Sequence, residues 1–280
     1  MSQPVVQCFR VAETAFSMIL LLALAGCGGT AQINNPSHST MKAGNWSITA
    51  KSSAETYIVG GNIQQSNSSL VGQMRVLGPC ESPTSNFDPS VAAPLSGAVD
   101  GTTFTLTVGP TPSGTVIRMK LSGSGTSLNN MAGTFTLEKE GCGPDQGTVE
   151  ANIVSVPKGH YLGKGIGTSG DSNVSVDLDW PQQAGPADAS GYIPLNVNLS
   201  YKNSSCSANT PVNGYLAGSI VDIVFVEGDG PNPVIFAFSG LLDPQANTVL
   251  KGTYQTLSGG SQPACSGDQG TIELDSTADL

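Results

Sequence analysis

A nine-residue motif occurs twice in this chain and limits what the chain can fold into. The first copy, Cys142–Glu150, reads Cys-Gly-Pro-Asp-Gln-Gly-Thr-Val-Glu, and the second, Cys265–Glu273, reads Cys-Ser-Gly-Asp-Gln-Gly-Thr-Ile-Glu. Self-similarity of this kind is typical of a duplicated structural unit. The chain is therefore predicted to contain two related domains.

Other landmarks recur around both copies in the same order. Each motif follows a strand-like run that opens with Gly-Thr-aromatic, at 133–135 and at 252–254. A second cysteine precedes each motif: Cys80 lies 62 residues before Cys142, and Cys206 lies 59 residues before the second copy. The repeat therefore extends well beyond the motif itself.

The predicted domain boundary falls in a short connection. The first domain is expected over residues 44–156 and the second, its internal repeat, over residues 157–280, each of about a hundred residues, which is a normal domain size. The link Ser155–Lys158 is only four residues long. A link this short predicts that the two domains are fixed neighbours.

Apolar residues alternate with polar residues in short runs in both domains. Phe104 and Leu106 alternate with threonines, and Leu195 and Val197 alternate with asparagines. A period of two is typical of strands with one buried face and one solvated face. No run after residue 27 has the period of an amphipathic helix. The pattern predicts an all-β chain of two tandem antiparallel domains.

The strand count favours a barrel for the first domain. Eight sequential strands suit a small up-and-down barrel, and a Greek-key sandwich remains the alternative. The expected strands are 45–50, 56–64, 70–77, 95–99, 102–108, 115–122, 132–138 and 148–154. We interpret Asp145-Gln146-Gly147 as a turn before the last of them, in which glycine supplies unusual backbone angles.

Two further patterns bear on the barrels. Gly44-Asn45-Trp46 resembles the Gly-x-Trp motif of lipocalins and avidins, in which the indole closes one barrel end. That resemblance covers the general layout and implies no ligand-binding residues. In the second domain, residues 220–226 and 234–238 are largely apolar on both faces. This predicts that one side packs against the first domain or under a long loop.

The N-terminus has the organisation of an export signal. Arg10 precedes an apolar run over residues 14–24, which is too short to span a bilayer. The run ends in Leu24-Ala25-Gly26-Cys27, which resembles the lipobox of bacterial lipoproteins. That resemblance implies cleavage before Cys27 and a diacylglycerol on its thiol.

The lipoprotein resemblance also implies a location. Residues 1–26 are expected to be the signal peptide, and residues 27–43, rich in Gly, Ser, Thr and Asn, a flexible tether. Gly28 stands where some lipoproteins carry the aspartate that retains them at the inner membrane. The protein is therefore expected in the cell envelope, anchored by lipid, with the outer membrane favoured.

Four cysteines remain for the two domains, and the repeat pairs them. Export makes disulfides permissible, and the repeat selects two of the possible pairings, namely Cys80–Cys142 and Cys206–Cys265. Zinc is the disfavoured alternative because the chain has no Cys-x-x-Cys pair and only two histidines. No metal or cofactor is expected.

Candidate site residues are few. Asp177 and Asp179 share one strand face and could serve a hydrolase or bind a cation. A solvated polar face explains them more simply, because the first repeat has uncharged Asn62 and Gln64 at an offset of 115 residues. His160 is expected at a surface or strand end.

The aromatic residues offer a second kind of candidate site. Trp46 and Trp180, with Tyr192 and Tyr201, could stack against a sugar if they are exposed, although core packing is the commoner fate of such residues. Trp46, Trp180 and the two aspartates are therefore the candidate ligand-binding residues.

The net charge and the motif content of the chain disfavour some classes of function. The net charge of −10 argues against nucleic acid as a partner. No Gly-x-Ser-x-Gly motif is present, so an enzyme is not expected, and a hydrolase using Asp177 and Asp179 is kept as an alternative. The expected function is a non-catalytic binding or structural module whose ligand is a small molecule, a glycan or an envelope protein. A carrier or sensor with a barrel cavity is the other alternative, and filled interiors would argue against it.

Overall fold

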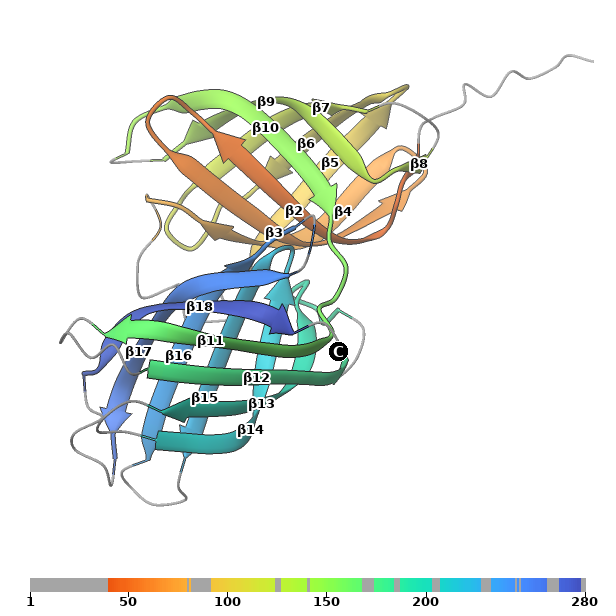
Figure 1. Ribbon diagram of the computed structural model, residues 1–280. Coiled ribbons are helices and arrows are strands. Elements are labelled where there is room, and N and C mark those ends of the chain that lie inside the picture. The colour runs from red at the N-terminus through yellow and green to blue at the C-terminus, as the bar shows by residue number, and fades with distance from the viewer. Residues whose placement is uncertain are drawn as a thin grey trace, which may run out of the picture. The chain divides into compact units, whose positions relative to one another are not determined.

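The chain was analysed as a computed structural model of all 280 residues. The structure describes residues 40–79, 81, 92–123, 127–139, 142–167, 174–183, 187–202, 207–227, 233–244, 246, 248–260 and 267–277. These residues belong to one compact unit and form β-strands (Figure 1). Over the described ranges, no helix has the length and apolar character needed to cross a membrane.

The first domain is a closed antiparallel barrel of eight strands, in the order β10-β2-β3-β4-β5-β6-β7-β9. All eight expected strands are present, and the barrel is confirmed in preference to the sandwich. Its strands are β2 (Gly44–Lys51), β3 (Thr56–Ser66), β4 (Ser69–Leu77), β5 (Ala93–Asp100), β6 (Thr103–Val108), β7 (Val116–Ser122), β9 (Asn130–Glu138) and β10 (Asp145–Ile153).

The second domain is also a closed barrel of eight antiparallel strands, paired in chain order from β11 to β18. The predicted repeat of one architecture along the chain is therefore confirmed. Its strands are β11 (Gly159–Gly167), β12 (Val174–Gln183), β13 (Ile193–Lys202), β14 (Ser207–Ala217), β15 (Ile220–Glu227), β16 (Val234–Leu242), β17 (Val249–Gly259) and β18 (Gln269–Thr277).

Large and small side chains alternate inside the first barrel. Trp46 on β2 lies opposite Gly61 on β3, and Gly133 on β9 lies between Leu121 and Val149 on the neighbouring strands. Each glycine leaves the room that the bulky residue across from it occupies. Small eight-stranded barrels are commonly filled in this way.

The second barrel is packed by the same principle. Gly163 on β11 lies between Val176 on β12 and Leu274 on β18. The rings of Phe236 and Tyr254 stack with their centroids 5.6 Å apart. Inward residues of the two barrels form separate hydrophobic cores, so each barrel encloses a core of its own.

A short parallel pair of strands packs against the first barrel. The pair consists of β1 (Thr40–Met41) and β8 (Ser127–Leu128), and it buries Met41 and Leu128 to 2% and 1% exposure. The residue after β1, Lys42, accepts a hydrogen bond of 2.9 Å from the indole N–H of Trp46. The segment of residues 40–42, which precedes the first barrel strand, is thereby attached to the barrel core.

The repeated Asp-Gln-Gly segment is not the turn that the sequence suggested. Strand β10 already begins at Asp145, and Gly147 lies within it. A Cβ atom at Gly147 would lie 2.1 Å from the main-chain oxygen of Lys51, and one at Gly270 would lie 2.1 Å from that of Ile166. Glycine is required here because two backbones approach closely, so the interpretation as turn geometry is wrong.

The two barrels are joined by buried polar contacts. Asn45 on β2 accepts a hydrogen bond of 2.6 Å from the N–H of Gly218 and donates one of 2.8 Å to its carbonyl oxygen. The hydroxyls of Ser47 and Ser219 lie 2.8 Å apart. Gly218 and Ser219 form the turn between β14 and β15, so this hairpin of the second barrel docks on the outer wall of the first.

Small residues permit the close approach of the barrels. A Cβ atom at Gly60 on β3 would lie 1.9 Å from the carbonyl oxygen of Ala217. Outward-facing Ile220 and Ala237 of the second barrel are fully buried, whereas Val226, farther along β15, is 55% exposed. Packing against the first domain therefore explains why both faces are apolar at the start of β15. It does not explain the apolar residue on the outer face at the end of this strand.

Candidate functional site

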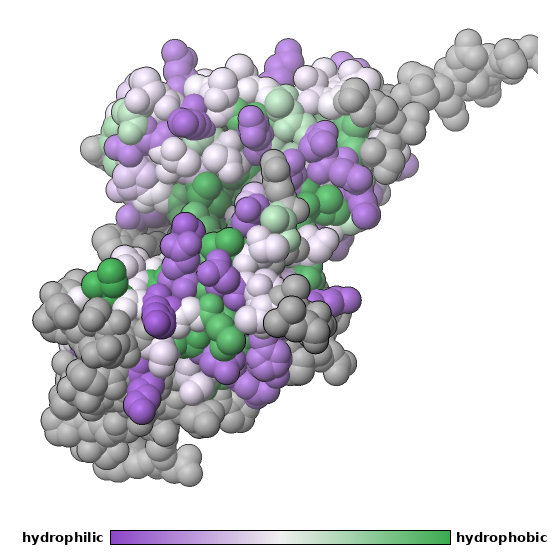
Figure 2. Space-filling view, in the orientation of Figure 1, coloured by the Kyte–Doolittle hydropathy of each residue, from purple (hydrophilic) through white to green (hydrophobic). Residues whose placement is uncertain are grey.

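The barrel interiors offer no room for a ligand at the positions that the sequence marks as central. Six such residues have 2% exposure or less: Phe104, Leu106, Ile117, Met119, Leu195 and Val197. These six side chains therefore have almost no surface that a ligand inside the barrels could contact. Candidate sites are therefore sought on the outer walls, where hydrophilic and hydrophobic residues are interspersed over the face shown in Figure 2.

Two of the predicted candidates, Asp177 and Asp179, meet His160 on the outer wall of the second barrel. His160 on β11 lies between two aspartates of β12, with Nδ1 3.6 Å from Asp177 Oδ1 and Nε2 3.5 Å from Asp179 Oδ1. Asn198 on β13 donates a hydrogen bond of 3.3 Å to Asp179. His160 is half exposed, so this cluster, which we call the His–Asp cluster, faces solvent.

The strand register corrects the comparison of these aspartates with the first repeat. His160 corresponds to Asn45, and the pairing with the neighbouring strand then makes Asp179 the equivalent of Asn62 and Asp177 the equivalent of Gly60. The constant offset of 115 residues was wrong here by two positions. In the first barrel, this part of the outer wall contacts the β14–β15 hairpin. The equivalent part of the second barrel carries larger, charged side chains instead.

The His–Asp cluster, as it is arranged here, can support few kinds of chemistry. Among the described residues, no group of three His, Cys, Asp or Glu side chains is arranged to hold a metal ion. The imidazole can exchange a proton with either carboxylate, but the cluster lies on an open wall. An open wall gives a substrate little of the enclosed surface that ligand sites usually provide.

The aromatic candidates lie in different environments. Trp46 is fully buried, so its indole offers no stacking surface, and the idea that it binds a ligand directly is not supported by its position. Tyr192 is also buried, at 1% exposure. The side chains of Trp180 and Tyr201 lie outside the described part of the structure.

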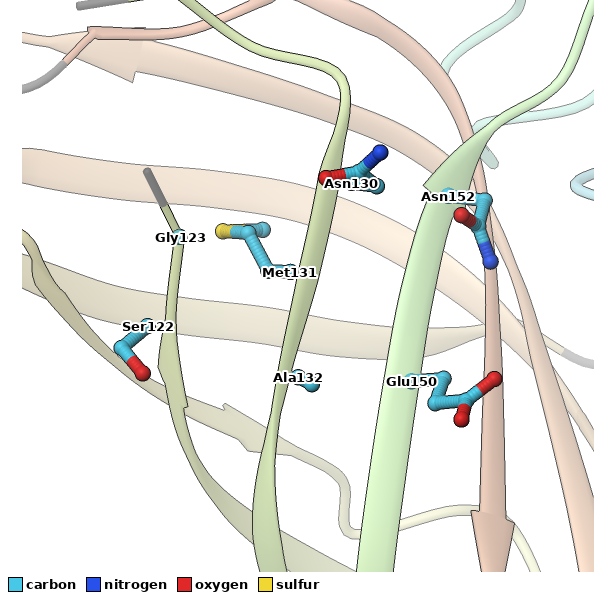
Figure 3. Close-up of a pocket in the computed structure, with 7 residues that line it drawn as sticks. All are labelled: Ser122, Gly123, Asn130, Met131, Ala132, Glu150 and Asn152. Carbon is cyan, nitrogen blue, oxygen red and sulfur yellow. The ribbon is translucent and has the colours of Figure 1, made fainter. Parts of the chain in front are cut away.

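An open hollow of about 470 Å³ lies on the outer wall of the first barrel (Figure 3). Neighbouring strands β7, β9 and β10 supply its wall, and Ala132 lies opposite both Ser122 and Glu150. The hollow is lined by Ser122, Gly123, Asn130, Met131, Ala132, Glu150 and Asn152. This is a polar depression with one carboxylate, two carboxamides and one hydroxyl.

Sequence reasoning did not single out this hollow, although a signal was available. Glu150 belongs to the repeated motif, and its counterpart in the second copy is Glu273. The strand partners of Glu273 are Lys251 and Lys164, whereas those of Glu150 are Ala132 and Thr49. Comparing the partners of the two glutamates would have marked the position.

A buried ion pair is the most unusual electrostatic feature of the described residues. Arg75 on β4 and Asp222 on β15 are 1% and 2% exposed, with Nε 3.3 Å from Oδ2. Ser239 donates a hydrogen bond of 2.6 Å to the carboxylate. Burial raises the pKa of Asp222 above its ordinary value, although Arg75 and Ser239 oppose the shift.

Tyr192 completes this buried group from the second barrel. Burial raises its pKa to about 12, although Arg75, which is hydrogen-bonded to it, acts in the opposite direction. The main-chain N–H of Tyr192 donates to Asp188 Oδ1 at 3.0 Å, which fixes the loop before β13. Arg75 of the first barrel is therefore held by several groups of the second.

The predicted disulfide and lipid sites lie almost entirely outside the described residues. Cys27, Cys80, Cys206 and Cys265 are not described, and Cys142 lies in the exposed segment before β10. The two pairings and the lipid site stay predictions.

Comparison with known proteins adds no family. No known protein family matches the chain, and no curated protein is similar to it. The function is therefore argued from the residues alone.

Proposed function

We propose that this protein is a lipid-anchored component of the cell envelope that acts as a non-catalytic binding or structural module through its outer walls. The observation that carries the proposal is the burial of central side chains in both barrels, since Phe104, Leu106, Leu195 and Val197 are at most 2% exposed. A carrier needs a ligand-sized cavity of at least about 300 Å³. Packed interiors therefore favour partners that bind outside.

The junction between the barrels supports a structural role. Asn45, Ser47 and Arg75 of the first barrel each contact the second barrel through buried polar groups. A buried polar group must find a partner or destabilise the fold, so these contacts hold the barrels in one arrangement. A fixed pair of barrels presents one continuous outer surface to a partner.

The anchor and the disulfides complete the proposal. The lipobox at Leu24–Cys27 supports lipid attachment, and more than one acyl chain gives stable membrane binding. Residues 27–43 serve as the tether, and the outer membrane is the proposed location. The proposed disulfides are Cys80–Cys142 and Cys206–Cys265, and the similar spacings of 62 and 59 residues in the two repeats support these pairings.

The anchor is tested by cell fractionation of two variants. Cys27→Ala is expected to move the protein from the membrane fraction to the soluble fraction of the envelope. Cys8→Ala, which lies within the signal, is the matched control and should leave the protein in the membrane fraction. An unchanged membrane association of Cys27→Ala would contradict the lipid anchor.

The binding role is tested with the Cys27→Ala protein and washed envelope material from the same cells. Saturable retention that unlabelled protein displaces is expected, because the outer walls remain free in this variant. Retention that is absent, or that rises in proportion to concentration without saturating, would contradict a binding role. A purely structural role then requires that deletion of the protein weakens the envelope to detergent.

A further inference from the structure

An equivalent glutamate on the outer walls of the two barrels has different strand partners. In the second barrel, Glu273 on β18 pairs with Lys251 on β17 and with Lys164 on β11, and Lys251 Nζ lies 2.9 Å from its carboxylate. In the first barrel, the corresponding partners of Glu150 are Ala132 on β9 and Thr49 on β2. The acid is thus present in both barrels, and lysines flank it only in the second.

The small side chain of Ala132 leaves room for the hollow in the first barrel. Ala132 ends at a single methyl group, and the hollow of about 470 Å³ lies over it. Among the described residues, Glu150 forms no ion pair, unlike Glu273. The second barrel therefore shows what group fits this wall when the place is filled: an ammonium on an aliphatic chain beside a carboxylate.

We propose that the hollow over Ala132 binds a primary ammonium group carried on an aliphatic chain. Glu150 supplies the negative charge, and the chain lies over the methyl of Ala132 as the stem of Lys251 does in the second barrel. The side-chain oxygens of Asn130 and Asn152 can accept the remaining N–H groups, since an ammonium has three donors. The two asparagines are a cross-strand pair.

The remaining chemistry of the hollow agrees with this ligand. Its lining contains one acidic side chain and no basic one, so an anion would meet no positive charge there. The net charge of −10 for the whole chain also draws cations toward the surface. In Figure 3 the Glu150 carboxylate is turned away from Ala132, and because Glu150 is exposed, a rotamer change on the picosecond to nanosecond scale brings it over the hollow.

This inference deepens the proposed binding role, because it names the chemistry of one outer-wall site. It is separable from that role, since small amines can be tested on the purified processed protein without any envelope material. Failure of amine binding would remove this site and leave the envelope-retention experiment to decide the wider proposal.

The test is a titration followed by NMR of alanine methyl groups, with the processed protein in nonionic detergent. The probes are 1,5-diaminopentane, which represents a free amine, and Nα-acetyl-lysine methylamide, which represents a lysine side chain presented by a peptide. Titration to about 50 mM at constant ionic strength detects binding with a Kd in the millimolar range. Saturable shifts of the Ala132 methyl are expected, and the probe with the lower Kd identifies the source of the ammonium.

Three variants decide between this site and general attraction to an acidic surface. Ala132→Lys recreates the Lys251–Glu273 pair of the second barrel; with the labelled methyl of Met131, which also lines the hollow, as the reporter in place of the Ala132 methyl, it should abolish the saturable shifts. Glu150→Gln should weaken amine binding about two- to fivefold, the range measured for exposed ion pairs. Glu273→Gln is the matched control in the second barrel and should leave the Kd unchanged.

A gain of binding offers the most demanding check. Lys251→Ala combined with Lys164→Thr reproduces the surroundings of Glu150 around Glu273 in the second barrel and should add a second set of saturable shifts there. Binding of 1,5-pentanediol as strongly as the diamine would overturn the role of charge. Absence of saturable shifts in the unmodified protein, or an unchanged Kd in Ala132→Lys, would overturn the site.

Discussion

Replacement of Asp222 by alanine is expected to uncouple the two barrels. The change leaves the guanidinium of Arg75, which is 1% exposed, without its carboxylate partner. Arginine cannot lose its proton in a protein, so the buried charge persists. Breaking a buried pair in this way costs about 3–5 kcal/mol, and the remaining contact with Tyr192 places the expected loss near the lower end, about 3 kcal/mol.

Three companion variants separate the contribution of charge from that of packing. Asp222→Asn keeps an oxygen that can accept from Arg75 and Ser239, so its cost should be smaller, about 1 kcal/mol. Arg75→Met leaves a carboxylate that can take up a proton, and its cost should also be below that of Asp222→Ala. The double variant Arg75→Met/Asp222→Leu should cost less than the sum of two single truncations, because no charge is left buried.

The pH dependence follows from the direction of the Asp222 shift. The folded state holds this proton more tightly than the unfolded state, because burial raises the pKa of the carboxyl in the fold. The contribution of Asp222 to the free energy of unfolding is therefore largest below its ordinary pKa and falls as the pH rises through the folded pKa. In Asp222→Asn this component should vanish.

The assay is urea unfolding followed by tryptophan fluorescence. The chain contains two tryptophans, Trp46 in β2 and Trp180 in β12, so Trp46→Phe and Trp180→Phe backgrounds report one barrel each. Both backgrounds should unfold at one midpoint when Asp222 is present and at two midpoints in Asp222→Ala. Coincident midpoints in Asp222→Ala, with a loss below about 0.5 kcal/mol, would refute the reasoning, because surface changes alone reach that size.

Three further substitutions test the packing at other positions by urea unfolding. Phe135→Tyr should stabilise the chain by about 0.5–1.5 kcal/mol, because the new hydroxyl can donate a hydrogen bond to Oδ2 of Asp145. This oxygen is buried and has no hydrogen-bond partner among the described residues. A lower urea midpoint would contradict this prediction. Tyr254→Phe, the matched change, should cost about 1 kcal/mol, since this hydroxyl lies 3.2 Å from both carboxylate oxygens of Asp268. Gly218→Ala should lower the free energy of unfolding by about 2 kcal/mol or more. The φ angle at this position is +62°, and the added Cβ would lie 2.4 Å from a main-chain oxygen of the first barrel. An unchanged urea midpoint would argue against the close approach of the two backbones.

The strands could be predicted because the period of two is a local property. Residues 102–108, for example, alternate threonine with Phe104, Leu106 and Val108, and the structure buries these three apolar side chains. Barrel closure could be favoured over a sandwich because eight sequential runs fill the first repeat. In both cases the information lies in neighbouring residues.

The junction of the barrels could not be predicted because it depends on pairs far apart in the chain. Asn45 and Gly218 are 173 residues apart, and neither stands out in a strand pattern. Gly60 has the appearance of an ordinary strand glycine until Ala217 is placed beside it. Arg75 had no visible partner in the sequence, since Asp222 occupies an otherwise apolar run.

The outer-wall sites were predictable only in part. Asp177 and Asp179 were correctly placed on one strand face, but the third member, His160, required the pairing of β11 with β12. The fixed offset between repeats failed because strand pairing, and not residue number, determines which residues correspond. The hollow over Ala132 shows the same point, since its significance depends on the strand partner of Glu150.

The most direct test of packed interiors is a titration of the purified protein with N-phenyl-1-naphthylamine, an apolar fluorophore of a size that a barrel cavity would hold. With Phe104, Leu106, Ile117 and Met119 filling the first barrel, we predict no saturable increase in fluorescence. A saturable one-to-one increase that a fatty acid displaces would reveal a ligand-sized cavity. That result would contradict the central claim that both barrels are filled and that partners bind on their outer walls.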